Sequence, residues 1–150
     1  MTPAWLTDLV NSGQVTRWDQ YRDADGIDYW RVWYRLPRFD GTQVCADYGM
    51  AMWFLEDGET YARNGQGWRS EAAERIDKGA LLCRQCKFQQ ACAEYGVAHE
   101  EHGTWGGLLP GDRDAVRQER NQMVNRVTIY STMEDLNGWD VEHVGTERVA

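Results

Sequence analysis

Four cysteines constrain this chain of 150 residues more than any other feature. Cys83, Cys86 and Cys92 lie within the ten residues CRQCKFQQAC, and Cys45 stands apart, which gives the pattern C-x37-C-x2-C-x5-C. The step of three residues from Cys83 to Cys86 lets both sulfurs face one point across a helical turn. With Cys45 supplied by a separate segment, the four thiols form one ligand set, suited to a structural zinc ion or an iron–sulfur cluster.

Four roles for the cysteines compete. Two disulfides would suit an oxidising compartment, but MTPAWLTDLVNSG has neither the cationic start nor the apolar stretch of a signal peptide, so a reducing cytoplasmic location is expected. A thioredoxin-like dithiol at CRQC needs a strand before it, and the preceding residues are predicted to be helical. Zinc sites usually combine two short Cys units, whereas this chain has one such pair and two single cysteines. A cluster tolerates uneven spacing, and by spacing alone cluster and zinc are evenly matched.

The hydrophobic pattern predicts a mainly α-helical fold, a small bundle of about four short helices, with a β-hairpin near the N-terminus and an irregular C-terminal tail. VTRWDQYR and IDYWRVWYRL flank the turn DADG and predict the hairpin. Helices are expected over residues 71–82 with Ser70 as N-cap, over 84–101 with Gly103 after its end, and from Pro110 to about residue 124. An Asn-Gly pair in the tail predicts a second hairpin.

The charge of the chain excludes several classes of function. The net charge is −8, and residues 111–150 carry five basic and eight acidic side chains. Tight autonomous binding to a phosphate backbone needs a basic surface, which no segment supplies. No stretch approaches the length of a membrane span, so no membrane partner is expected. No Ser/His/Asp set or carboxylate pair stands out, and an enzyme activity would depend on the thiols alone. None of the three histidines is expected to be a metal ligand, because four cysteines complete a site.

A longer segment carries a family resemblance. CRQCKFQQACAEYGVAHEEHGTWGGLLPGDRDAVR resembles the WhiB-like family of actinobacterial and actinophage transcription regulators, which show a distant first cysteine, C-x2-C-x5-C, a helix, a G-[VI]-W-G-G turn and a charged helix. GTWGG at residues 103–107 matches that turn with Thr in place of Val or Ile, and CADYGMAMWF resembles the segment of the first cysteine. The resemblance covers about residues 43–120. The gap between Cys45 and Cys83 is longer than is usual in the family.

The resemblance implies a [4Fe–4S] cluster in a domain at residues 43–125, between an aromatic-rich extension at 1–42 and an acidic tail at 126–150. The cluster, which would organise the helices, is expected to respond to oxygen or nitric oxide. The resemblance also implies docking on the C-terminal domain of the primary sigma factor, and through it on RNA polymerase. The implied cluster ligands are Cys45, Cys83, Cys86 and Cys92, and the implied sigma-binding residues are Trp105, Gly103, Gly106, Gly107, Trp53 and Phe54. Without the family context, Trp105 would be interpreted as an ordinary core tryptophan.

One departure from the family affects the predicted mechanism. WhiB-like proteins typically continue into a basic DNA-binding tail, and this tail is acidic. The remaining cationic feature is Arg113, Arg117 and Arg120, on one face of the last helix, which is either a solvated face or a contact to nucleic acid or a partner. Promoter DNA is therefore expected to be bound weakly or indirectly, which suits a phage-encoded protein that inhibits or competes with host regulators. The alternatives are a zinc-stabilised interaction module and a thiol–disulfide oxidoreductase acting through Cys83 and Cys86.

Overall fold

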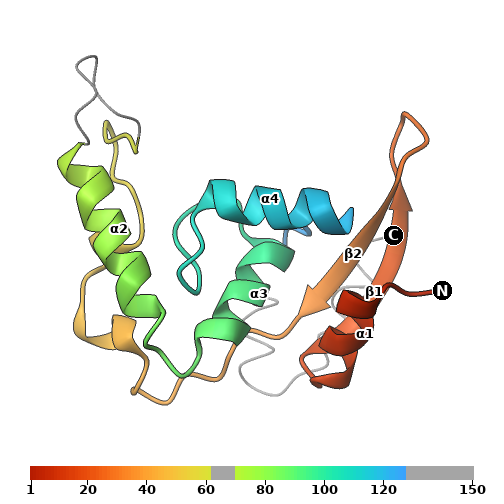
Figure 1. The fold of residues 1–150 in the computed structure, drawn as a ribbon, viewed down its shortest axis with the longest axis horizontal. Helices are drawn as coiled ribbons and strands as arrows, with labels where there is room; N and C mark the ends of the chain where they lie inside the picture. The colour runs from red at the N-terminus through yellow and green to blue at the C-terminus, as the bar shows by residue number, and fades with distance from the viewer. Residues whose placement is uncertain (62–69, 128–150) are drawn as a thin grey trace.

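The computed structural model describes residues 1–61 and 70–127 (Figure 1). Within them the chain forms helices and one two-stranded sheet, as the sequence predicts. The hairpin and the first helix lie at one end of the molecule, two helices occupy its middle, and another helix stands at the opposite end. The elements in chain order are α1 (Ala4–Asn11), β1 (Val15–Arg22), β2 (Asp28–Tyr34), the 3₁₀ helices η1 (Val44–Asp47) and η2 (Met50–Met52), α2 (Glu71–Cys83), α3 (Gln89–His99) and α4 (Pro110–Arg120).

The predicted N-terminal hairpin is confirmed. β1 and β2 pair antiparallel, with Trp18 opposite Val32. The turn between them forms because the Asp23 carboxylate accepts the backbone N–H groups of Asp25 and Ile27, both at 2.9 Å. Gly26 takes the positive φ of 82° that this tight turn requires. The DADG signal therefore specifies the turn through local hydrogen bonds.

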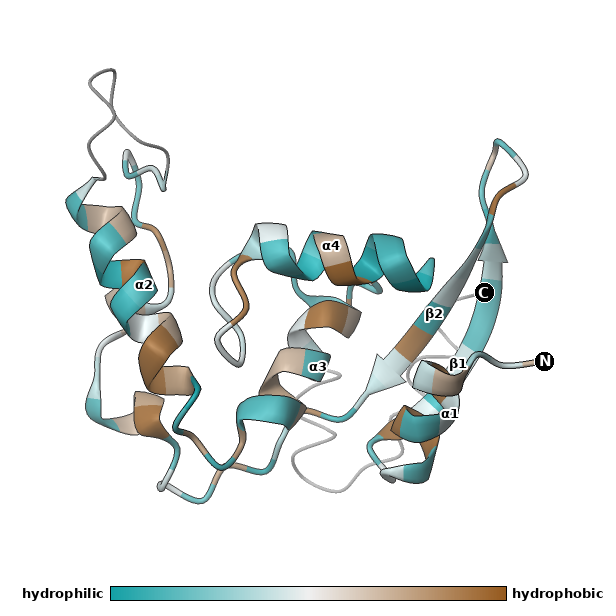
Figure 2. Ribbon diagram, in the orientation of Figure 1, coloured by the Kyte–Doolittle hydropathy of each residue, from teal (hydrophilic) through white to brown (hydrophobic). Residues whose placement is uncertain are grey.

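The hydrophobic core joins the N-terminal segment to α3. Its fully buried members come from α1, β2 and α3: Leu6, Val32, Tyr34, Tyr95 and Ala98. Figure 2 shows apolar stretches on β2 and α3, two elements that contact each other. Because this core crosses the predicted boundary at residue 42, the first forty residues stabilise the cysteine-bearing part directly. The division into three domains stays a prediction.

Within the described residues the predicted helices are present, but several of them begin or end at other residues than predicted. α2 is confirmed with its cap, since the Ser70 hydroxyl accepts the N–H of Ala73 at 2.9 Å. The predicted helix over 84–101 is wrong at both ends: residues 84–88 form turns closed by hydrogen bonds between residues three apart, and α3 ends at His99. Gly103 therefore belongs to a later turn and does not cap this helix.

The last described helix is shorter than predicted. α4 ends at Arg120, because Asn121 takes the left-handed conformation with φ 54° and stops the helix. Its first turn is closed by the N–H of Leu109, which donates to the Asp112 carboxylate at 3.0 Å. The predicted hairpin in the tail lies outside the described residues. No helix in the described ranges is long and apolar enough to cross a membrane.

A candidate four-thiol metal centre

Three separate elements and one turn carry the four cysteines. Cys83 is the last residue of α2, Cys86 lies in the turn that follows, and Cys92 lies on α3. Cys45 lies on η1, which contacts α2. All four are free thiols; Cys45 is exposed and the other three are half-buried. Since CRQC follows a helix, it lacks the strand that precedes a thioredoxin-like dithiol.

The thiols lie close enough to influence one another's ionisation. Burial, and then the nearby Cys83, Cys45 and Cys86, raise the pKa of Cys92 to about 12, although the backbone N–H of Gly106 lowers it. Burial and the neighbouring thiols also raise the pKa of Cys83 and of Cys45. Four groups that repel one another as anions are stabilised as thiolates by a cation placed among them. A cation placed among the thiols would therefore oppose the effect of burial on the pKa values of Cys92, Cys83 and Cys45.

The two kinds of occupant that the sequence suggests differ in the ligand spacing that they need. Among the described residues, no three His, Cys, Asp or Glu side chains converge closely enough to hold a single metal ion. A tetrahedral zinc ion with Zn–S bonds of about 2.3 Å needs its sulfurs about 3.8 Å apart. A four-iron cluster binds each thiolate at a different iron, so its ligands stand farther apart. The described residues form no closed metal site, so the choice between a cluster and zinc stays a prediction.

The glycine-rich turn lies against the two helices that carry Cys83 and Cys92. The turn is closed between Trp105 and Leu108, which exchange backbone hydrogen bonds of 3.0 and 2.9 Å. A side chain on Gly106 would collide with the backbone of α3, and one on Gly107 would lie 3.1 Å from the carbonyl oxygen of Ala80 in α2. Both glycines have positive φ, of 58° and 82°. The backbone N–H groups of Gly106 and Gly107 favour the thiolates of Cys92 and Cys83 respectively and oppose the effect of burial.

Trp105 packs inward from this turn. Its ring lies 5.3 Å from that of Tyr95, between centroids, and its indole N–H donates to the carbonyl of His102 at 3.1 Å. Gly96 makes room for it, since a Cβ there would lie 2.5 Å from the Cβ of Trp105. Trp105 thus joins the edge of the hydrophobic core, and only part of its surface remains exposed. Its role as a sigma-binding anchor stays a prediction.

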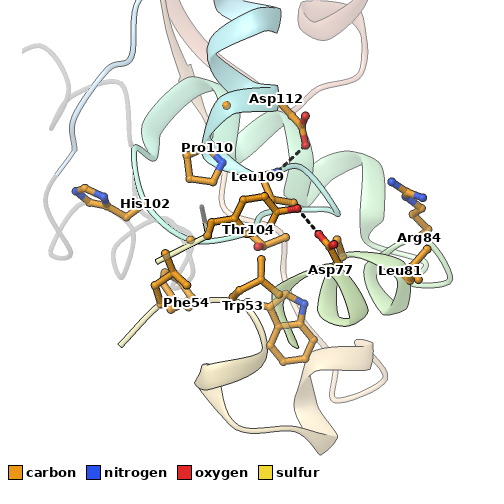
Figure 3. Close-up of a pocket in the computed structure, with 16 residues that line it drawn as sticks. Trp53, Phe54, Asp77, Leu81, Arg84, His102, Thr104, Leu109, Pro110 and Asp112 are labelled. Atoms are coloured by element: carbon orange, nitrogen blue, oxygen red, sulfur yellow. Dashed lines mark hydrogen bonds between the residues drawn. The ribbon is translucent and has the colours of Figure 1, made fainter. Parts of the chain in front are cut away.

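A groove of about 810 Å³ lies beside the turn, between α2 and the start of α4 (Figure 3). The predicted flanking residues Trp53 and Phe54 both line it. Trp53 is only 4% exposed, and its indole N–H donates to the carbonyl of Gly79 at 3.0 Å. The N–H of Thr104 donates to the carbonyl of Trp53 at 2.7 Å, and a side chain on Gly103 would collide with the Phe54 ring. The structure therefore brings the segment after Cys45 and the GTWGG turn together along one groove.

The pattern of cysteines and turn agrees with a comparison against known families. The protein-family model described as transcription factor WhiB matches residues 40–122, which is more than half of the chain and includes all four cysteines and the turn. The chain belongs to the WhiB family. The WhiB family is one of transcription factors and not of enzymes. A search of curated proteins gave no match.

The arginine stripe of this WhiB protein points into the molecule. Arg113 is fully buried and donates to the carbonyls of Gly103 and Leu108 at 2.7 Å, and to those of His102 and Glu100 at 3.1 and 3.2 Å. The two other arginines of the stripe are also engaged within the described structure: Arg117 donates to the carbonyl of Glu100, and Arg120 forms an ion pair with Glu94. The stripe is therefore no solvated face. Its contact with nucleic acid or a partner stays a prediction.

The structural role of Arg113 escaped sequence reasoning. The four carbonyls that it binds belong to the loop and turn between α3 and α4. Three of them accept a second hydrogen bond: Leu108 from the N–H of Trp105, His102 from the Trp105 indole and Glu100 from Arg117. Buried carbonyl groups need donors, and the guanidinium of Arg113 is the donor that all four share. The sequence indicates that the carbonyls around the GTWGG turn would need hydrogen-bond donors if they were buried. It does not indicate that Arg113 would supply them.

Proposed function

We propose that this WhiB protein binds a [4Fe–4S] cluster through Cys45, Cys83, Cys86 and Cys92 and regulates transcription by docking on the C-terminal domain of the primary sigma factor. The observation that carries the proposal is the set of four mutually interacting thiols directly beside the GTWGG turn. When bound, the cluster supplies reactivity toward oxygen and nitric oxide. The protein's own residues supply the thiolates, the N–H groups that face them and the surface presented to the partner.

The cysteines would also connect the fold. Cys45 comes from η1, Cys83 from α2 and Cys92 from α3, so a shared ligand set ties together segments that are distant in sequence. Since the pKa values of Cys83 and Cys92 are raised in the chain without a metal, these thiols hold their protons at neutral pH, and occupation of the site would release those protons. The free energy of cluster binding is then part of the free energy of folding.

The partner surface that we propose is the groove beside the turn. Phe54, Leu81 and Leu109 give it an apolar lining, and Trp105 holds the turn from behind. The acidic tail lacks the cations whose counterion release makes DNA binding strong, so promoter contact is weak or passes through the sigma factor. A protein that occupies the sigma factor in this way competes with other regulators of the same host, which is the role expected of a phage-encoded inhibitor.

The first experiment is anaerobic purification with metal and sulfide analysis. We expect a brown protein with about four irons and four sulfides per chain. A colourless protein with one zinc would replace the proposal with a zinc-stabilised interaction module. Reduction of insulin disulfides by the metal-free protein, lost on Cys83→Ser, would instead indicate an oxidoreductase.

The second experiment is co-purification with the sigma factor C-terminal domain. Trp105→Ala should abolish the complex, because the turn loses the side chain that seats it on Tyr95 and Gly96. Leu81→Asp tests the groove itself, since Leu81 is 56% exposed and its replacement leaves the core intact. Ile27→Asp, at the 47% exposed end of the hairpin, is the matched control and should bind normally. Normal binding by Leu81→Asp would show that the groove is not the docking surface.

A further inference from the structure

We propose that Cys45 is the releasable ligand of the four-thiol site, and that an exposed clasp between residues 39–40 and 87–88 controls its release. This inference rests on the proposed function, because it concerns how the same site opens. It follows from an asymmetry among the four cysteines that neither the spacing pattern nor the family match describes.

Burial divides the four ligands unequally. Cys83 and Cys92 are half-buried at the ends of α2 and α3, where the turn of Gly106 and Gly107 covers them. Cys45 is exposed, and no residue of η1 is buried. A ligand on a segment without a buried side chain has little packing to keep its sulfur in place once the bond to the metal breaks.

The N–H donors show the same division. The backbone N–H groups of Gly106 and Gly107 favour the thiolates of Cys92 and Cys83. The donor that interacts with Cys45 belongs to its own backbone. Hydrogen bonds to ligand sulfurs stabilise the thiolate and tune a cluster from the protein side. Neighbouring elements thus support Cys83 and Cys92 in a way that they do not support Cys45.

The segment of Cys45 is held to the rest of the site by the clasp. Lys87 Nζ lies 2.6 Å from Asp40 Oδ2, and the rings of Phe39 and Phe88 meet edge to face with centroids 5.3 Å apart. Lys87 and Phe88 follow Cys86 directly, so the clasp joins the chain before the first ligand to the chain after the third. The charged side chains are 56% and 49% exposed, a setting in which an ion pair is weak and screened by salt. The clasp can therefore open without disturbing the core.

The proposed release is a simple exchange of ligands. In a loaded site, a water molecule would take the place of the Cys45 thiolate at the metal, and the thiolate would leave with its electron pair. No electron is transferred. A thiolate freed in this way attacks iodoacetamide, forming a carbon–sulfur bond with loss of iodide. Movement of the segment from residue 38 to residue 50 would then expose the site on the side of Cys45, where small oxidants and nitric oxide could reach it.

The test is competitive alkylation of the full-length, cluster-loaded protein under anaerobic conditions. Light iodoacetamide is added for increasing times, the cluster is stripped in denaturant, and the remaining thiols are labelled with heavy iodoacetamide before mass spectrometry. We expect Cys45 to be labelled severalfold faster than Cys83 and Cys92. Equal rates for all four cysteines, or labelling of Cys92 first, would overturn the inference.

Two variants test the clasp. Asp40→Asn and Phe39→Ala should each raise the labelling rate of Cys45 and leave that of Cys92 unchanged. Arg22→Met, which breaks the exposed ion pair of Arg22 with Asp28 on the hairpin, is the matched control and should change neither rate. Unchanged labelling of Cys45 in both clasp variants would remove the clasp from the proposal. A wild-type protein that takes up no iron or sulfide would instead refute the proposed function, so the two failures are distinct.

Discussion

Arg113→Met removes the guanidinium that holds the turn and keeps an apolar side chain of similar length. Arg113 is 0% exposed and donates hydrogen bonds to four backbone carbonyls, two of them at 2.7 Å. Each hydrogen bond contributes about 0.5–1.5 kcal/mol net, so the four together contribute about 2–6 kcal/mol. Burial, and then the nearby Arg117, lower the pKa of Arg113 to about 10, so desolvation offsets part of this gain. We therefore expect a loss of about 2–4 kcal/mol in the free energy of unfolding.

The assay is a urea titration followed by tryptophan fluorescence, with the metal site in the same state of loading in each protein. A loss of this size is a large fraction of the stability of an ordinary domain, about 5–15 kcal/mol, and should shift the midpoint clearly. Arg113→Lys should recover little, because one ammonium group cannot reach four carbonyls that a planar guanidinium reaches together. Arg22→Met, on the exposed surface of the hairpin, is the control and should leave the midpoint unchanged.

Two outcomes would refute this reasoning. A wild-type midpoint for Arg113→Met would mean that water or a shifted backbone satisfies the four carbonyls at no cost. Full stability of Arg113→Lys would mean that the positive charge matters and the forked geometry does not. Loss of sigma factor binding in Arg113→Met at a temperature where the variant stays folded would show, in addition, that the turn must be held in place for docking.

Further predictions concern the packing of α3. His99 is buried, its Nε2 accepts the N–H of Tyr34 at 2.9 Å and its Nδ1 lies 2.7 Å from the carbonyl of Asn125, and burial lowers its pKa to about 4. The unfolded chain protonates this histidine at a higher pH than the folded chain does. The free energy of unfolding should therefore fall by about 3 kcal/mol as the pH drops from about 6.5 to about 4. Equilibrium unfolding of His99→Gln should show a flatter pH dependence. Gly96→Ala should lower the thermal unfolding midpoint, since the new Cβ would lie 2.5 Å from that of Trp105. Gly111→Ala, with no atom within 4 Å of its Cβ, is the control and should be neutral or slightly stabilising. Equal midpoints for the two variants would mean that Trp105 can move aside.

The sequence by itself determined the features that depend on neighbours in the chain. The DADG turn and the Ser70 cap are closed by hydrogen bonds between residues two to four apart, so the hairpin and α2 appear where the sequence predicts them. The same holds for the cysteine spacing and the glycines of the GTWGG turn, which identify the family and the candidate ligands. Even here the ends of α3 and α4 were misjudged, because periodicity continues into residues whose backbone forms turns or, at Asn121, takes a left-handed conformation.

Only the tertiary structure decided which way the side chains face. A stripe at Arg113, Arg117 and Arg120 is equally consistent with a solvated face, a nucleic-acid contact or a buried network, because helical periodicity defines a face and not its surroundings. Here the carbonyls of the loop and turn after α3 accept hydrogen bonds from the first two arginines and hold them inside. Trp105 likewise packs inward because Gly96, which lies on α3 and not in the turn, leaves space for its side chain. The asymmetry between Cys45 and the other cysteines has the same origin, since burial is a property of the assembled elements and not of the spacing along the chain.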